Sequence, residues 1–147
     1  MKMTKLFVCL VGMASIFSCA PKQTETEIPV ALQLYTVRNE LKADFLGTLC
    51  KVSEMGYDGV EFAGLNGYEP AQIKTWCDSL GLTPISAHVP LAEMLADVDK
   101  VIADYKTIGC EYIVVPYVTA ERRPGGELFM QMVDEIRAIG EIGRAHV

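Results

Sequence analysis

Blocks of apolar and polar positions follow one another in a regular order through residues 30–140, and each block predicts a helix or a strand. Three segments share one layout: an amphipathic helix, a glycine, a few linking residues and an apolar strand. They are TLCKVSEMGYDGVEFAG (48–64), IKTWCDSLGLTPISAHV (73–89) and KVIADYKTIGCEYIVVP (100–116). A glycine just past a helix adopts the left-handed conformation that turns the chain back. The repeat therefore predicts helix ends at Gly56, Gly81 and Gly109.

Helical spacing places the apolar residues on one face of each expected helix. Pro70 suits the first turn of the second helix, because the backbone N–H that proline lacks has no partner there. We expect each apolar face to be buried against a sheet. The faces consist of Leu41, Phe45, Leu49 and Val52 in the first helix, Ile73, Trp76, Cys77 and Leu80 in the second, and Leu91, Leu95, Val98, Val101, Ile102, Tyr105 and Ile108 in the third.

The expected strands alternate with these helices, which predicts an α/β fold with parallel strands and helical crossovers. A fourth helix is expected within GGELFMQMVDEIRAIG (125–140), and the strands are expected at 30–37, 58–63, 84–89 and 112–116. A doubly wound sheet and a (β/α)8 barrel both fit this pattern. No glycine-rich phosphate loop follows the first strand, where the sequence reads LYTVRNEL, so the barrel is favoured. Since a barrel needs about 250 residues, we expect the N-terminal half of a TIM barrel, about four βα units, over residues 30–140.

The N-terminal residues do not follow the helix and strand pattern of residues 30–140. Residues 1–18 combine a basic start with a short apolar stretch and predict a signal peptide. IFSC (16–19) resembles a bacterial lipobox, so we expect lipidation at Cys19, a polar tether over 19–29 and an exported protein anchored to a bacterial membrane, facing the periplasm or the cell surface. An ordinary secretory signal is the alternative.

The last seven residues, EIGRAHV (141–147), read as the translation of a common sequencing adapter, which predicts a non-native tail on a truncated fragment. The alternative is a natural helix end. On either interpretation we expect no function for His146.

Charge and cysteine content narrow the possible functions. The formal net charge is −6, and removal of Lys2 and Lys5 with the leader would leave 11 basic residues against 19 acidic ones, a net charge of −8. Such an acidic domain is a poor partner for nucleic acid, which needs clustered basic residues. Cys50, Cys77 and Cys110 match no zinc-binding spacing, so we expect them to be buried as small apolar residues.

Candidate chemistry lies at the carboxyl ends of the expected strands, where barrel enzymes place their active sites. On the first strand Gln33 and Tyr35 share a face. On the second, Glu61 projects opposite to its two apolar neighbours, and on the third Ser86 and His88 share a face. A carboxylate and an imidazole that converge on one site suit hydroxyl binding and proton transfer. The alternative is that Glu61 and His88 only satisfy each other.

Four stretches together resemble the sugar phosphate isomerase/epimerase family of xylose isomerase-like barrels, over residues 30–140. They are LQLYTVRNEL (32–41), GYDGVEFAG (56–64), LGLTPISAHVPL (80–91) and IGCEYIVVP (108–116). The resemblance implies a (β/α)8 barrel with one divalent ion, manganese, magnesium or similar. It also implies that the metal ligands come from later strands, so no metal ligand is assigned in this chain.

The same resemblance implies an isomerase or epimerase that acts through an enediolate on a free sugar or keto-sugar. Glu61 and His88 would be catalytic and would bind substrate together with Gln33 and Tyr35. Where the xylose isomerase branch pairs its early histidine with an aspartate, this chain has only Glu93, which argues against ring opening. The fragment alone is expected to be inactive.

Three other functions remain open from the sequence. They are a lyase or hydratase on oxidised sugars, a non-catalytic sugar-binding lipoprotein, and an abasic-site endonuclease of the same fold. The acidic charge and the single usable histidine argue against the nuclease.

Overall fold

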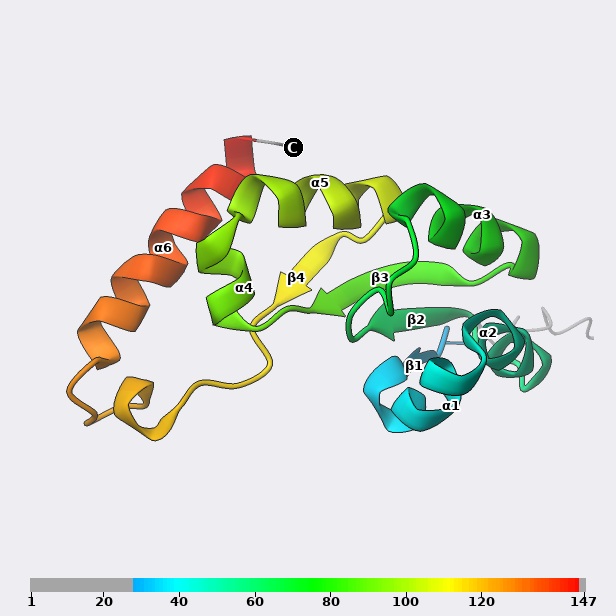
Figure 1. Ribbon diagram of the computed structural model, residues 1–147, viewed down its shortest axis with the longest axis horizontal. Helices are drawn as coiled ribbons and strands as arrows, with labels where there is room; N and C mark the ends of the chain where they lie inside the picture. The colour runs from blue at the N-terminus through cyan, green and yellow to red at the C-terminus, as the bar shows by residue number, and fades with distance from the viewer. Residues whose placement is uncertain (1–27, 146–147) are drawn as a thin grey trace, which may run out of the picture.

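A computed structural model describes residues 28–145, which form one parallel sheet with helices in the connections (Figure 1). The strands are β1 (Ala31–Gln33), β2 (Gly59–Phe62), β3 (Thr83–His88) and β4 (Tyr112–Val114), in the order β1-β2-β3-β4. Every neighbouring pair is parallel. Sequential parallel strands with helical crossovers are the repeating unit of a TIM barrel, as the sequence pattern predicted.

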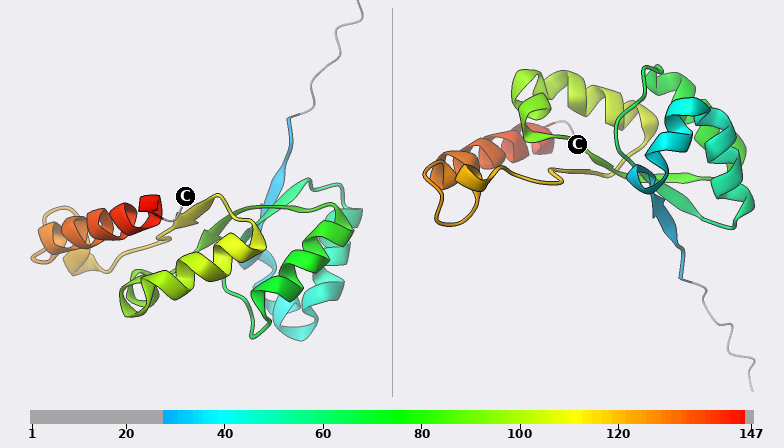
Figure 2. Two further views of the ribbon diagram at one scale, coloured as in Figure 1. Left: turned by 90° about the horizontal axis from the view of Figure 1, so that it is seen from above. Right: turned by 60° about the horizontal axis from the view of Figure 1, so that its bottom comes forward.

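α3 packs against α2 and α5, and α4, α5 and α6 pack against one another. In the view from above in Figure 2, α3 and α5 lie over the sheet. The helices are α1 (Arg38–Ala43), α2 (Phe45–Glu54), α3 (Pro70–Leu80), α4 (Leu91–Ala96), α5 (Val98–Ile108) and α6 (Phe129–Ala145), with short 3₁₀ helices η1 (Leu34–Val37) and η2 (Ala120–Arg122).

Two helices that the periodicity predicted as continuous are each broken by an aspartate. Asp44 has extended backbone angles between α1 and α2, and its Oδ1 accepts the backbone N–H of Gly47 at 2.9 Å. Asp97 makes the same type of cap between α4 and α5, where its Oδ1 accepts the N–H of Lys100 at 3.0 Å. A capping aspartate starts a new helix because it satisfies an N–H without a partner in the first turn. The break also leaves Leu95 46% exposed, so its prediction as a buried residue was wrong.

The first strand is shorter than predicted. It ends at Gln33, and the residues predicted to continue it to position 37 form η1 instead. The Gln33 side chain caps this turn by accepting the backbone N–H of Tyr35. Tyr35 therefore does not share a strand face with Gln33, and that part of the prediction was wrong.

The core lies between the sheet and its helices and contains most of the predicted apolar faces. The buried residues include Leu41, Phe45, Leu49 and Val52 from the first predicted face, Ile73 and Cys77 from the second, and Val101, Ile102, Tyr105 and Ile108 from the third. Gly81 and Gly109 cap α3 and α5 with φ angles of 67° and 104°. The predicted helix ends at these two glycines are confirmed.

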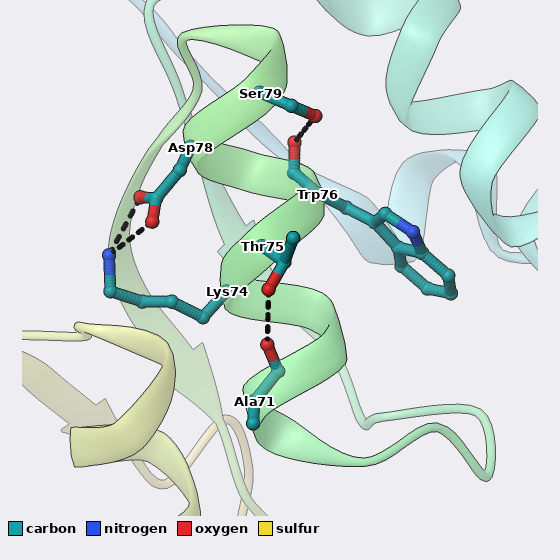
Figure 3. A network of polar contacts seen from close by, with 6 residues as sticks. All are labelled: Ala71, Lys74, Thr75, Trp76, Asp78 and Ser79. Atoms are coloured by element: carbon teal, nitrogen blue, oxygen red, sulfur yellow. Dashed lines mark hydrogen bonds and ion pairs between the residues drawn. The ribbon is translucent and has the colours of Figure 1, made fainter.

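An aromatic cluster joins α2 to α3 across the loop between β2 and α3. The ring of Tyr68 lies 5.1 Å from that of Phe45 and 5.0 Å from that of Trp76. Figure 3 shows the Trp76 ring projecting from α3, whose other side carries the Lys74–Asp78 ion pair. This helix therefore has one face for packing and one for solvent, the arrangement expected of an outer helix of a barrel.

Some predictions concern residues outside 28–145. The signal peptide, Cys19, nearly all of the tether, and His146 lie outside the described residues. Within 28–145, no helix combines the length and apolar character needed to cross a membrane.

Candidate active site

The candidate active site begins with a row of polar residues across three strands. Gln33 of β1 is in register with Glu61 of β2, and Glu61 is in register with Ser86 of β3. The second pairing depends on an irregularity: Val60 pairs with Pro84, but the next residue, Glu61, pairs with Ser86. This shift places the Ser86 side chain beside the Glu61 carboxylate.

His88 connects Gln33 to Glu61. Its Nε2 lies 2.9 Å from Oε1 of Glu61, and its Nδ1 lies 3.0 Å from Nε2 of Gln33. The second carboxylate oxygen of Glu61 accepts a hydrogen bond from Oγ of Ser86 at 2.5 Å. The side chains of His88 and Glu61 are 29% and 22% exposed, so the group is only partly open to solvent. Three strands thus contribute to one connected hydrogen-bonded group.

A cavity of about 620 Å³ opens at the carboxyl ends of the strands, beside this group. Its lining residues come from the ends of β1 and β3 and from the segments that follow each of the four strands. They are Gln33, Tyr35, Ala63, Gly64, His88, Pro90, Glu93, Pro116 and Tyr117. A concave site at this end of parallel strands is the usual position of a barrel active site.

Aromatic side chains flank the cavity on both sides. Tyr35 and Tyr117 are 58% and 66% exposed, although large aromatic rings are usually more buried. The guanidinium of Arg38 lies 4.5 Å from the centre of the Tyr35 ring, a cation–π contact that favours this position of the ring. The cavity therefore offers two accessible aromatic surfaces next to a polar group, which suits a ligand with both hydroxyls and C–H faces.

Tyr105 of α5 is hydrogen-bonded to a residue of the cavity wall. The backbone N–H of Gly64, which lines the cavity, donates a hydrogen bond to the Tyr105 phenol oxygen. Burial, and secondarily the nearby Glu93 carboxylate, raises the pKa of Tyr105 to about 12. The phenol is therefore neutral around neutral pH and acts as a fixed part of the wall.

The structure joins three of the four predicted site residues directly. Gln33, Glu61 and His88 form one hydrogen-bonded chain, and Tyr35 lines the same cavity from η1. Ser86 was noted on the same face as His88, but no role was predicted for it. Its buried hydrogen bond to Glu61 makes it part of the site.

The described residues do not form a metal site. Within 28–145 no group of three or more His, Cys, Asp or Glu side chains is arranged to hold a metal ion. Both ring nitrogens of His88 and both carboxylate oxygens of Glu61 already have hydrogen-bond partners. The divalent ion that the resemblance implies would therefore need ligands from residues other than the described ones.

Comparisons with known proteins define the class of the fold. No family model and no curated protein matches the chain. Solved structures do match it, and they are xylose isomerase-like TIM barrels, so the chain has the fold of part of such a barrel.

The similar structures include two sugar phosphate isomerase/epimerases and one AP endonuclease. A sugar phosphate isomerase/epimerase from Parabacteroides distasonis ATCC 8503 is 25% identical with a TM-score of 0.55, and the match covers 78% of this chain and 52% of that one. A second one from the same organism is 16% identical with a TM-score of 0.60, over 87% and 51%. An AP endonuclease, family 2, from Brucella melitensis is 16% identical with a TM-score of 0.58, over 81% and 52%. The chain spans about half the length of these structures, and the two matches at 16% show the fold alone.

Proposed function

We propose that this chain is the first half of a metal-dependent isomerase or epimerase that enolises a free sugar or keto-sugar. The observation that carries the proposal is the group formed by Gln33, Glu61, Ser86 and His88 at the edge of the 620 Å³ cavity. The similarity to the sugar phosphate isomerase/epimerase structure that is 25% identical supports the same reaction class. The divalent ion would take its ligands from residues outside this chain and would stabilise charge on neighbouring sugar oxygens.

The residues of this chain would bind and orient the sugar. An ionised carboxylate can accept about four hydrogen bonds, and Glu61 uses only two of its positions within the site. The remaining positions can accept sugar hydroxyls. Gln33 uses one of its two amide hydrogens and keeps the other for a substrate oxygen. The exposed rings of Tyr35 and Tyr117 would pack against the C–H faces of the sugar.

Enolisation can be tested without knowing the product. The protein completed by the second half of its reading frame would be incubated in D₂O with a panel of aldoses and keto-sugars. An enediolate exchanges a carbon-bound hydrogen with solvent, so deuterium would enter the substrate whether the enzyme isomerises or epimerises it. Absence of both deuterium exchange and any new sugar product, with binding retained, would favour a non-catalytic sugar-binding protein.

The remaining alternatives give different outcomes in the same preparation. A lyase or hydratase acting on oxidised sugars would consume sugar acids with loss or gain of water. An endonuclease would cut a duplex that carries an abasic site. We expect no cutting, since the mature domain would be strongly acidic and DNA binding needs clustered positive charge.

We also propose that the protein is exported and anchored to a bacterial membrane through lipid on Cys19. The proposal rests on the IFSC motif behind a basic and apolar leader. Export favours an unphosphorylated sugar over a sugar phosphate as substrate.

A further inference from the structure

The hydrogen bonds of Gln33 fix the orientation of its amide. Its Oε1 lies 2.7 Å from the backbone nitrogen of Tyr35, and a backbone N–H can only donate. The atom that faces Tyr35 must therefore be the amide oxygen. The amide nitrogen is then the atom that lies 3.0 Å from Nδ1 of His88.

This orientation determines which nitrogen of His88 carries the proton. The amide nitrogen of Gln33 can only donate, so Nδ1 must accept and must be unprotonated. A neutral imidazole has one donor and one acceptor, so the proton lies on Nε2. That nitrogen lies 2.9 Å from the Glu61 carboxylate, which can accept it.

The opposite tautomer fits the site poorly at both nitrogens. A proton on Nδ1 would point at the N–H of Gln33, and an unprotonated Nε2 would point its lone pair at Oε1 of Glu61. The hydroxyl of Ser86 completes the pattern by donating to the other oxygen of Glu61. Each contact in the chain from Tyr35 to Ser86 therefore pairs a donor with an acceptor in only one arrangement of protons.

We infer that Gln33 is a positioning residue that holds His88 as the neutral tautomer protonated on Nε2, so that His88 donates to Glu61. In this state Nδ1 of His88 is covered by the amide and does not accept a proton from a bound sugar. Glu61 is left as the hydrogen-bond acceptor of the site. The functional meaning of this inference rests on the proposed function, but the tautomer itself is a property of this chain.

The test is a long-range ¹H–¹⁵N correlation spectrum of the 147-residue chain with ¹⁵N-labelled histidine at neutral pH. His146→Ala removes the one other histidine, so that a single imidazole remains. We expect the far-downfield ¹⁵N shift of an unprotonated nitrogen at Nδ1 and the shift of a protonated nitrogen at Nε2. A downfield shift at Nε2, or averaged shifts at both nitrogens, would overturn the inference. This result does not depend on whether the variants at Gln33 fold.

The decisive variant is Gln33→Glu. A carboxylate can still accept the N–H of Tyr35, but its second oxygen would then face Nδ1 with a lone pair, which favours a proton there. We expect the Nδ1 shift to move upfield to that of a protonated nitrogen. Gln72→Glu makes the same change on an exposed position of α3 and should leave both shifts unchanged.

The outcomes separate this inference from the proposed function. If Gln33→Glu folds and Nδ1 stays unprotonated, Gln33 does not select the tautomer. Gln33→Met keeps the length of the side chain without a donor, and it should broaden or average the two shifts. Failure to exchange deuterium into any sugar would leave these spectra unaffected and would contradict only the proposed reaction.

Discussion

His88 has a hydrogen-bond partner on each side of its ring, and this decides what the residue can do. Nδ1 faces Gln33 and Nε2 faces Glu61, while the ring itself borders the cavity. The ring thus orients Glu61 and closes one wall of the site. Loss of the ring would remove one of the two partners that hold the Glu61 carboxylate, and displacement of this proposed catalytic group would lower turnover.

We therefore expect His88→Ala, in the protein completed by its second half, to lower turnover by on the order of 10²–10⁴-fold. Metal content should stay nearly unchanged, because no described residue beside His88 forms part of a metal site. Metal stoichiometry, melting temperature and turnover would be measured on one preparation, with Gln72→Ala on the exposed side of α3 as the control. Loss of metal together with activity would refute the assignment, and loss of stability alone would make His88 a structural residue.

At the scale of the helices and strands, the caps set the geometry that brings the strand ends together. Gly81 and Gly109 each hold a left-handed conformation at the end of a helix, and in each case a strand begins within three residues. Asp44 and Asp97 begin α2 and α5 with side-chain caps. These short-range features determine where each helix stops and where the next strand enters the sheet.

Gly109→Ala tests the cap of α5. The φ angle of 104° is unfavourable for a residue with a Cβ, so we expect a loss of about 1–2 kcal/mol in the free energy of unfolding. Gly140→Ala is the matched control, because Gly140 lies inside α6 and its added Cβ would make only an ordinary contact. That substitution should be neutral or stabilising by up to about 1 kcal/mol. Urea denaturation followed by circular dichroism measures both, and equal effects would contradict the role of the cap.

Across the whole molecule, the core between the helices and the sheet contains three groups that ionise only at high pH. Burial, with a smaller contribution from Asp78, raises the pKa of Cys77 from 9.0 to about 11. Burial raises that of Cys110 from 9.0 to about 12 and that of Tyr105 from 10.0 to about 12. Cys77 is fully buried, as the sequence predicted, and Cys110 is partly buried against the core.

These shifts predict how stability depends on pH. The unfolded chain loses the thiol protons from about pH 9, while the folded chain retains them to higher pH. The two protonated thiols therefore contribute their full free energy of stabilisation below pH 9. This contribution is lost as the pH rises through 11 to 12. The urea midpoint should therefore fall from pH 9 upward. Cys77→Ala should make this fall shallower between pH 9 and 11, whereas Ser79→Ala on the exposed side of α3 should not. If the urea midpoint of Cys77→Ala falls with pH as steeply as that of the wild-type chain, the raised pKa of Cys77 does not contribute to this pH dependence.

The proposed anchor predicts where the whole protein is found. In a bacterial host with lipoprotein processing, the wild-type chain should incorporate labelled fatty acid and sediment with membranes, because several acyl chains give stable attachment. Cys19→Ser should abolish both, while Cys9→Ser, within the apolar part of the leader, should not. Equal labelling of the Cys19→Ser variant would disprove lipidation at this residue.

The sequence by itself determined the order of helices and strands, the parallel sheet and most of the core. Period-3.6 spacing and the cap glycines are local signals, since they depend on residues within one or two turns. The aspartates that divide two helices are also local signals, and attention to Asp44 and Asp97 as caps would have predicted both breaks. The candidate residues Gln33, Glu61 and His88 were found for a similar reason, because polar residues at the ends of parallel strands must gather at one edge of the sheet.

Only the tertiary structure decided how these residues meet. The register change between Val60 and Glu61 sets Ser86 beside the carboxylate, and strand register depends on contacts between segments far apart in sequence. Tyr35 lies in a 3₁₀ turn and not in the strand, and the Gln33 amide caps this turn. The same amide is hydrogen-bonded to His88, which is 55 residues away in the sequence. Local pattern fixes the elements, whereas the proton arrangement of the site requires the positions of three strands relative to one another.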